Sequence, residues 1–147
     1  MRDMINNKQV VFLGNLTLSG TTPAASDWVD VQDYDACTIM VVNNTITDAG
    51  TAAGFTLAVQ HGDDETAAGA AAIETTDAVD GAISISVTDD SADNSIAGGI
   101  GYKGSKRYVR VNAVGTTGTD ADVSVIAVLN KPHRAPTDFV GTSVAAT

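Results

Sequence analysis

Apolar and polar residues alternate strictly in several segments of this 147-residue chain. In the segment 55–61, Phe55, Leu57 and Val59 fall on one face, with polar or small residues between them. A period of two is the pattern of a β-strand that buries one face. The same reasoning predicts strands at 10–18, 28–31, 37–42, 82–87, 106–113 and 122–129, separated by turns rich in Gly, Asp, Asn and Thr.

Seven or eight short strands with turns between them predict an all-β chain, folded as a single β-sandwich or jelly-roll-like domain. Only 5% of the residues are aromatic, so Val, Ile and Leu are expected to supply most of the core. The domain is assigned to residues 10–130, between extended arms at both ends. The N-terminal arm is residues 1–9, and the C-terminal arm is residues 131–147, which contain two prolines and no periodicity.

The sequences of several segments give more specific predictions about local structure. Segment 37–42 is apolar on both faces, which favours a central strand covered on each side. The polar 43–50 and the glycine-rich 98–101 predict loops, and the alanine-rich 66–76 predicts an irregular excursion. In the strand 82–87, the residues expected to point inward are Ile83, Ile85 and Val87.

Positive charge is concentrated in the tract 98–114, which we call the cationic tract. It contains four of the eight cationic residues, whereas the interval between Lys8 and Lys103 holds 14 acids and no cation. Arginine and tyrosine are enriched at protein interfaces, so this tract is either a contact surface or the polar face of an ordinary strand. The residues predicted for the contact surface are Tyr102, Lys103, Lys106, Arg107, Tyr108 and Arg110, together with Lys131, Pro132, His133, Arg134 and Phe139 of the C-terminal arm.

Composition and motifs exclude several classes of function. The net charge of −10 argues against binding to nucleic acid or to an anionic membrane, and no stretch approaches the roughly 18 apolar residues of a membrane span. The two histidines lie in no catalytic motif, so neither an enzyme nor a cofactor is expected. The acidic segment 89–94 has the oxygen density of a calcium loop but lacks the glycine and final glutamate of an EF-hand, which favours a solvated turn and no metal.

The tract 101–111, with the strand 123–129 and the following Lys131-Pro132, resembles small head decoration or cement proteins of tailed bacteriophages. The resemblance implies a virion structural protein on the capsid exterior that stabilises contacts between capsomers. It also implies assembly in the host bacterial cytoplasm, the major capsid protein as partner, and association with itself as a homotrimer or homodimer. The contact surface above would then be the capsid or subunit interface.

A second interpretation is a carbohydrate-binding, adhesion or tail structural module of a phage. Four aromatic residues would stack on sugar rings if they shared one exposed face. These residues are Trp28, Tyr34, Tyr102 and Tyr108.

Overall fold

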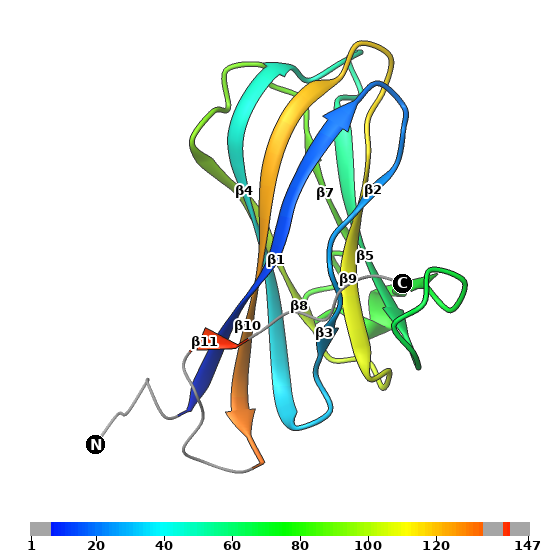
Figure 1. Cartoon of the computed structure of the whole chain (residues 1–147), viewed down its shortest axis with the longest axis vertical. Coiled ribbons are helices and arrows are strands. Elements are labelled where there is room, and N and C mark those ends of the chain that lie inside the picture. Colours follow the sequence, from blue (N-terminus) through cyan, green and yellow to red (C-terminus); the bar gives the residue numbers. More distant parts are fainter. Residues whose placement is uncertain (1–6, 134–139, 142–147) are drawn as a thin grey trace.

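The computed structural model describes residues 7–133 and 140–141, and these residues form two antiparallel β-sheets packed face to face (Figure 1). The described parts contain seven strands of four or more residues, four strands of two residues, and one 3-10 turn, η1 (Thr75–Asp77). The prediction of an all-β sandwich is confirmed. No helix in the described residues is long and apolar enough to cross a membrane.

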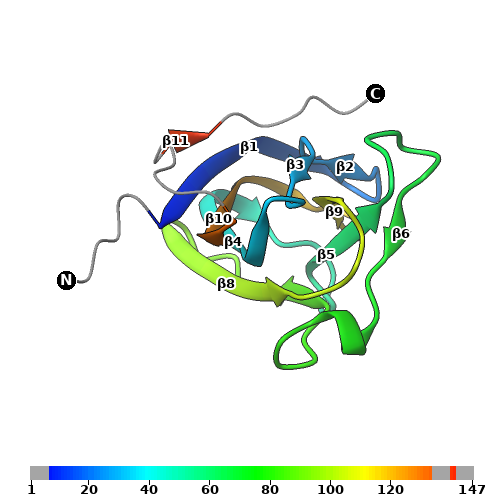
Figure 2. The same ribbon diagram turned by 90° about the horizontal axis from the view of Figure 1, so that it is seen from below.

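The larger sheet has five strands in the order β11-β1-β10-β4-β8 (Figure 2). All of its pairings are antiparallel except that of β11 with β1. β10 therefore lies between the two other long strands and pairs with both. The strands are β1 (Lys8–Ser19), β4 (Tyr34–Asp48), β8 (Ser95–Tyr102), β10 (Asp120–Pro132) and β11 (Val140–Gly141).

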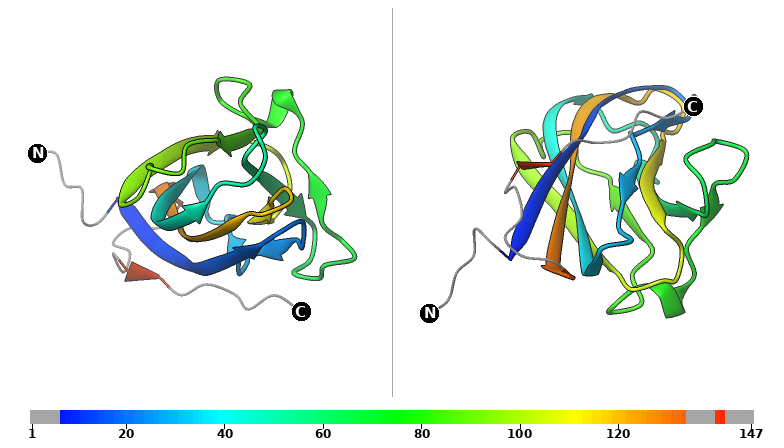
Figure 3. Two further views of the ribbon diagram at one scale, coloured as in Figure 1. Left: turned by 90° about the horizontal axis from the view of Figure 1, so that it is seen from above. Right: turned by 60° about the horizontal axis from the view of Figure 1, so that its bottom comes forward.

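The smaller sheet is built around β5 (Phe55–Gly62) and β9 (Tyr108–Val114), which pair with each other. Short strands extend it on both sides. β2 (Ala24–Ala25) and β3 (Val29–Asp30) pair with β9, whereas β6 (Ala71–Ala72) and β7 (Ser84–Val87) pair with β5. The segment that carries β6 and η1 projects from the sandwich beside β5 (Figure 3).

The core lies between the two sheets and is made by the inward positions of the long strands. In β10, Val123, Val125 and Leu129 are buried, and in β9, Val109 and Val111 are buried. They belong to one continuous cluster of apolar side chains, which explains why strands with so few aromatic residues form a stable domain.

A β-bulge in β1 keeps both halves of that strand in the core. Phe12 pairs with Ile126 and Gly14 with Val125, so Leu13 has no partner across the ladder. The extra residue shifts the alternation by one position, and Leu13 and Leu16 are therefore both buried although they are three positions apart.

Three local expectations were wrong. The glycine-rich 98–101 is not a loop but part of β8, and β4 continues through the polar residues that follow Val42 as far as Asp48. Irregularities in the pairing of β4 with β10 allow this, because they break the period of two without ending the strand. Ile83 precedes β7 and is exposed rather than inward.

Candidate functional site

Three of the four cations of the tract, Lys103, Lys106 and Arg107, lie in the connection from β8 to β9. This connection joins the two sheets at one end of the sandwich. It borders a cleft of about 450 Å³. Val31, Tyr34 and Asp35 line the cleft on the side of the β3–β4 connection. Lys103, Lys106 and Arg107, three of the predicted interface residues, also line it. The structure thus brings these three cations together at one opening.

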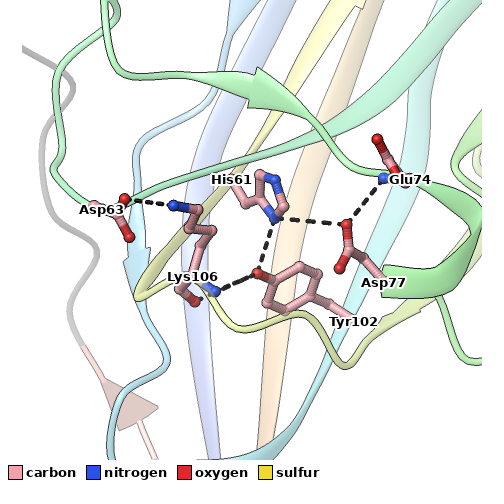
Figure 4. A network of polar contacts seen from close by, with 6 residues as sticks. All are labelled: His61, Asp63, Glu74, Asp77, Tyr102 and Lys106. Atoms are coloured by element: carbon pink, nitrogen blue, oxygen red, sulfur yellow. Dashed lines mark hydrogen bonds and ion pairs between the residues drawn. The ribbon is translucent and has the colours of Figure 1, made fainter.

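Tyr102 holds the β8–β9 connection in place through hydrogen bonds of its hydroxyl (Figure 4). Its side chain is buried, and its hydroxyl lies 3.0 Å from Nδ1 of His61 on β5 and accepts a hydrogen bond from the backbone N–H of Lys106 at 3.1 Å. His61 Nδ1 also lies 4.0 Å from a carboxylate oxygen of Asp77, which accepts the backbone N–H of Glu74. Tyr102 is therefore a buried structural residue whose hydrogen bonds link the connection to both sheets, and it is not a surface residue.

The phenol of Tyr102 should make stability depend on pH in alkaline solution. Burial raises its pKa from 10.0 to about 12. A pKa that is higher in the folded state gives a stabilising contribution that is complete below about pH 10 and is lost as the pH rises towards about 12. We expect Tyr102→Phe to be less stable than the wild type by about 1–2 kcal/mol at neutral pH, because the Lys106 N–H loses its acceptor.

This difference should shrink between about pH 9.5 and pH 11.5, and urea denaturation of both proteins across that range measures it. The buried thiol of Cys37, whose pKa is also raised to about 12, is present in both proteins, so the comparison isolates the effect of replacing the phenol. A difference that stays constant or grows over this range would contradict the assignment.

Two of the three cations at the cleft are already neutralised within the chain. Arg107 donates from Nε and Nη2 to one oxygen of Asp30, at 3.0 and 2.7 Å, and Lys106 forms an ion pair with Asp63. Both pairs are solvent-exposed and contribute little to stability. Lys103 is exposed, and no ion pair joins it to another described residue. The charge that the cleft offers to a partner is therefore chiefly that of Lys103.

Arg110 does not lie on the surface. It stands between the core residues Val109 and Val111 on β9 and so points to the opposite side of the smaller sheet, where only 6% of it is exposed. Its guanidinium lies 4.6 Å from the ring centroid of Trp28 and donates from Nε to Gln60 Oε1 at 3.0 Å. Burial lowers the pKa of Arg110. Its contacts make it a packing residue of the folded domain.

The remaining predicted interface residues lie in different places. Tyr108 is half-buried beneath the Arg107 guanidinium, which is 4.9 Å from its ring centroid. Lys131 and Pro132 belong to the end of β10, and His133 contacts Asp35 through Nε2 at 2.9 Å. Arg134 and Phe139 lie outside the described residues.

The aromatic residues considered for sugar binding do not share an exposed face. Trp28 and Tyr102 are buried, and Tyr34 donates its hydroxyl to Gln9 Oε1 at 2.7 Å. The hypothesis that these four residues form an aromatic platform for sugars is therefore wrong.

Carboxylates of the acidic segment 89–94 accept backbone hydrogen bonds that hold the fold together, instead of converging on a metal site. Asp90 Oδ1 accepts the backbone N–H of Ala49 at 2.7 Å, and Asp93 accepts that of Ile46. Within residues 7–133 and 140–141, no group of three or more His, Cys, Asp or Glu side chains is placed to hold a metal ion.

A surface that the sequence interpretation missed lies on the outer side of the larger sheet. Phe12, Ile126 and Met40 are neighbours across β1, β10 and β4, and Phe12 is 52% exposed. Ile96 on the edge strand β8 is 66% exposed. We call this surface the outer apolar face. Its residues are Val10, Phe12, Met40, Val42, Ile96, Ile126 and Val128.

On β1 and β10 the outer apolar face is bordered by the polar side chains of Asn15 and Ser124, which lie in the same row as Val42 and Ile96. Ser124 Oγ donates to Asn15 Oδ1 at 2.5 Å and accepts from Asn44 Nδ2 at 2.8 Å. The prediction that segment 37–42 is covered on each side was therefore wrong. Its apolar residues point to both sides of the larger sheet, but within the described residues the core covers only the inner side.

With this geometry established, comparison with known proteins identifies the fold. The chain matches no family model and no curated protein sequence. Among solved structures, the PBSX exported protein XepA superposes on 85% of this chain with a TM-score of 0.53 and 12% identity. The chain shares the sandwich fold of XepA. It spans 38% of the XepA chain.

Two further structures superpose more loosely. The pili of Bacillus endospore appendages match with a TM-score of 0.41 and 14% identity, covering 90% of this chain and 96% of theirs. The xylan-binding module CBM15 matches with a TM-score of 0.36 and 14% identity, covering 89% of this chain and 95% of the module.

Proposed function

We propose that this protein is a virion structural protein that binds the outside of a tailed-phage head as a decoration or cement protein. The observation that carries the proposal is the outer apolar face, because it marks the protein as a member of an assembly, whichever of its surfaces meets the shell. Water-soluble domains rarely leave a continuous apolar surface uncovered on a sheet, and such surfaces are sites of protein association. The resemblance of the tract 101–111 to phage head proteins supports the choice of the head, and the described β-sandwich suits a rigid brace.

The proposed partner on the shell is the major capsid protein. The cleft end would meet it through Lys103 and the exposed end of β10, while the acidic remainder of the surface keeps free copies soluble. Each such contact is weak because it is exposed to solvent. Binding would therefore depend on repetition across the many equivalent sites of a shell, and the bound copies would brace the joints between capsomers.

The proposal is tested by co-sedimentation of the purified protein with undecorated phage shells, followed by the thermal resistance of those shells. Saturable binding together with a raised melting temperature of the shell is the expected result. Binding to tails instead of heads, or no binding to either, would overturn it.

Lys103→Ala is expected to weaken shell binding about three- to tenfold, because a rim charge contributes on the order of 1 kcal/mol to association. The matched control is Thr117→Glu, at an exposed loop position in the β9–β10 connection. Both variants make the chain more negative by one charge, but only the first changes the cleft. Equal binding by the two variants would remove Lys103 from the interface.

A further inference from the structure

We infer that the outer apolar face packs against the same face of a second copy, about a two-fold axis perpendicular to the strands. This inference deepens the proposed function and rests on it, since it names the surface through which an assembly protein meets itself. Shell attachment is left to the cleft end of the molecule.

The shape of the outer apolar face favours another sheet as its occupant. Its side chains form continuous rows across neighbouring strands, with Val10 beside Val128 and Phe12 beside Ile126, and they lie over the middle of the larger sheet rather than in a groove. Sheet faces pack on one another at about 10 Å by interdigitating their side chains. A second copy supplies a face of matching size and composition.

The distribution of charge favours a second copy in particular. Two molecules of net charge −10 repel each other over most of their surfaces. The outward positions in the rows of Val10, Phe12 and Asn15 contain no acidic residue on β1, β10, β4 or β8. The outer apolar face and its polar border are thus where like-charged copies approach with the least repulsion.

Charge at the two ends of this surface also sets the orientation. Lys8 lies in the row beyond Val10, whereas Asp122 lies at the opposite end, opposite Thr17. If the strands of the two copies run antiparallel, the Lys8 end of each face approaches the Asp122 end of the other. A parallel arrangement would place like charges together. Complementary charge therefore selects the antiparallel two-fold packing.

The test is the mass of the full chain in solution, by sedimentation equilibrium over concentrations of protein from micromolar to about half millimolar, a range that covers weak and strong dimers. The wild type is expected to be a dimer. Phe12→Asp places a carboxylate in the centre of the interface and should raise the dimer dissociation constant at least about 100-fold. Phe12 is already half exposed, so the monomer should keep its fold, which circular dichroism checks.

The matched control is Val114→Asp. Val114 is an exposed apolar residue (38%) at the end of β9 in the smaller sheet, so its replacement makes the same chemical change away from the face. Its dissociation constant should stay within about twofold of the wild type. Orientation is tested by charge exchange: Lys8→Glu and Asp122→Lys should each weaken the dimer, and the double variant should restore it.

The outcomes separate this inference from the proposed function. A wild-type monomer or trimer, or a Phe12→Asp dimer as tight as the wild type, would overturn the two-fold packing even if shells are still bound. If the wild type is monomeric and Phe12→Asp abolishes shell binding, the face meets the capsid and the inference is wrong. A dimer that is dispersed by Phe12→Asp but ignores shells would support the packing and overturn the proposed function.

Discussion

Replacing Trp28 with alanine is expected to lower the free energy of unfolding by about 3–5 kcal/mol. Trp28 is fully buried, and it packs outside the cluster between the sheets, against the guanidinium of Arg110. The substitution removes the largest buried side chain and leaves a cavity, and it also removes the aromatic face that stabilises the buried guanidinium of Arg110. A loss of this size is a large fraction of the usual stability of a domain.

Urea denaturation followed by far-ultraviolet circular dichroism measures this change, because the variant lacks the chain's single tryptophan. Trp28→Phe provides a graded control. It keeps an aromatic ring and removes an indole N–H that has no hydrogen-bond partner among the described residues, so its cost should be clearly smaller. A Trp28→Ala variant that loses less than about 1 kcal/mol would show that the packing of Trp28 against Arg110 contributes little to stability, contrary to the expectation for buried aromatic residues.

Gly54→Ala is expected to destabilise the protein by about 3 kcal/mol or more, from backbone strain and overpacking together. Gly54 has φ of +66°, which L-residues adopt at a cost. A Cβ at this position would also collide with the backbone carbonyl of Val87 and with Cα of Thr88. Because Phe55 pairs with Val87, relief of the collision would have to displace the pairing of β5 with β7.

Gly20→Ala separates the two contributions. Gly20 has φ of +56°, but a Cβ there would meet no atom within 4 Å, so this variant carries only the conformational cost of about 1–2 kcal/mol. Thermal unfolding of both variants alongside the wild type gives the comparison. Equal losses in the two variants would mean that the backbone around Val87 adapts freely.

Strands in which apolar and polar residues alternate strictly could be predicted from the sequence. Burial of one face of a strand is enough to impose this alternation. The segment 55–61 is an example, and β5 occupies it with Phe55, Leu57 and Val59 buried. β8 could not be predicted in the same way. Its glycines have no side chains to carry a period, and Ile100 is the single large residue of 98–101 that marks the inward face.

The candidate surfaces divide along similar lines. The sequence correctly gathers Lys103, Lys106 and Arg107, because they lie in one short connection. It could not reveal that Arg110 is buried, because the covering side chain, Trp28, comes from a distant segment. The outer apolar face depends on the register of four strands, so its residues come together only when the pairing is known. The order of apolar and polar residues along the chain does not by itself reveal how the strands are paired.

The position of β10 has a consequence for how the chain is made. β1 and β4 do not pair with each other. β4 pairs with β8 on one edge, but its other edge and the long edge of β1 are both filled by β10, the last long strand of the described residues. During translation, both earlier strands leave the ribosome with open edges and apolar faces, and they stay so until residues 120–132 have emerged from the exit tunnel. Unpaired strands of this kind are prone to aggregate. The nascent protein therefore has its greatest need of a chaperone in the interval before β10 emerges.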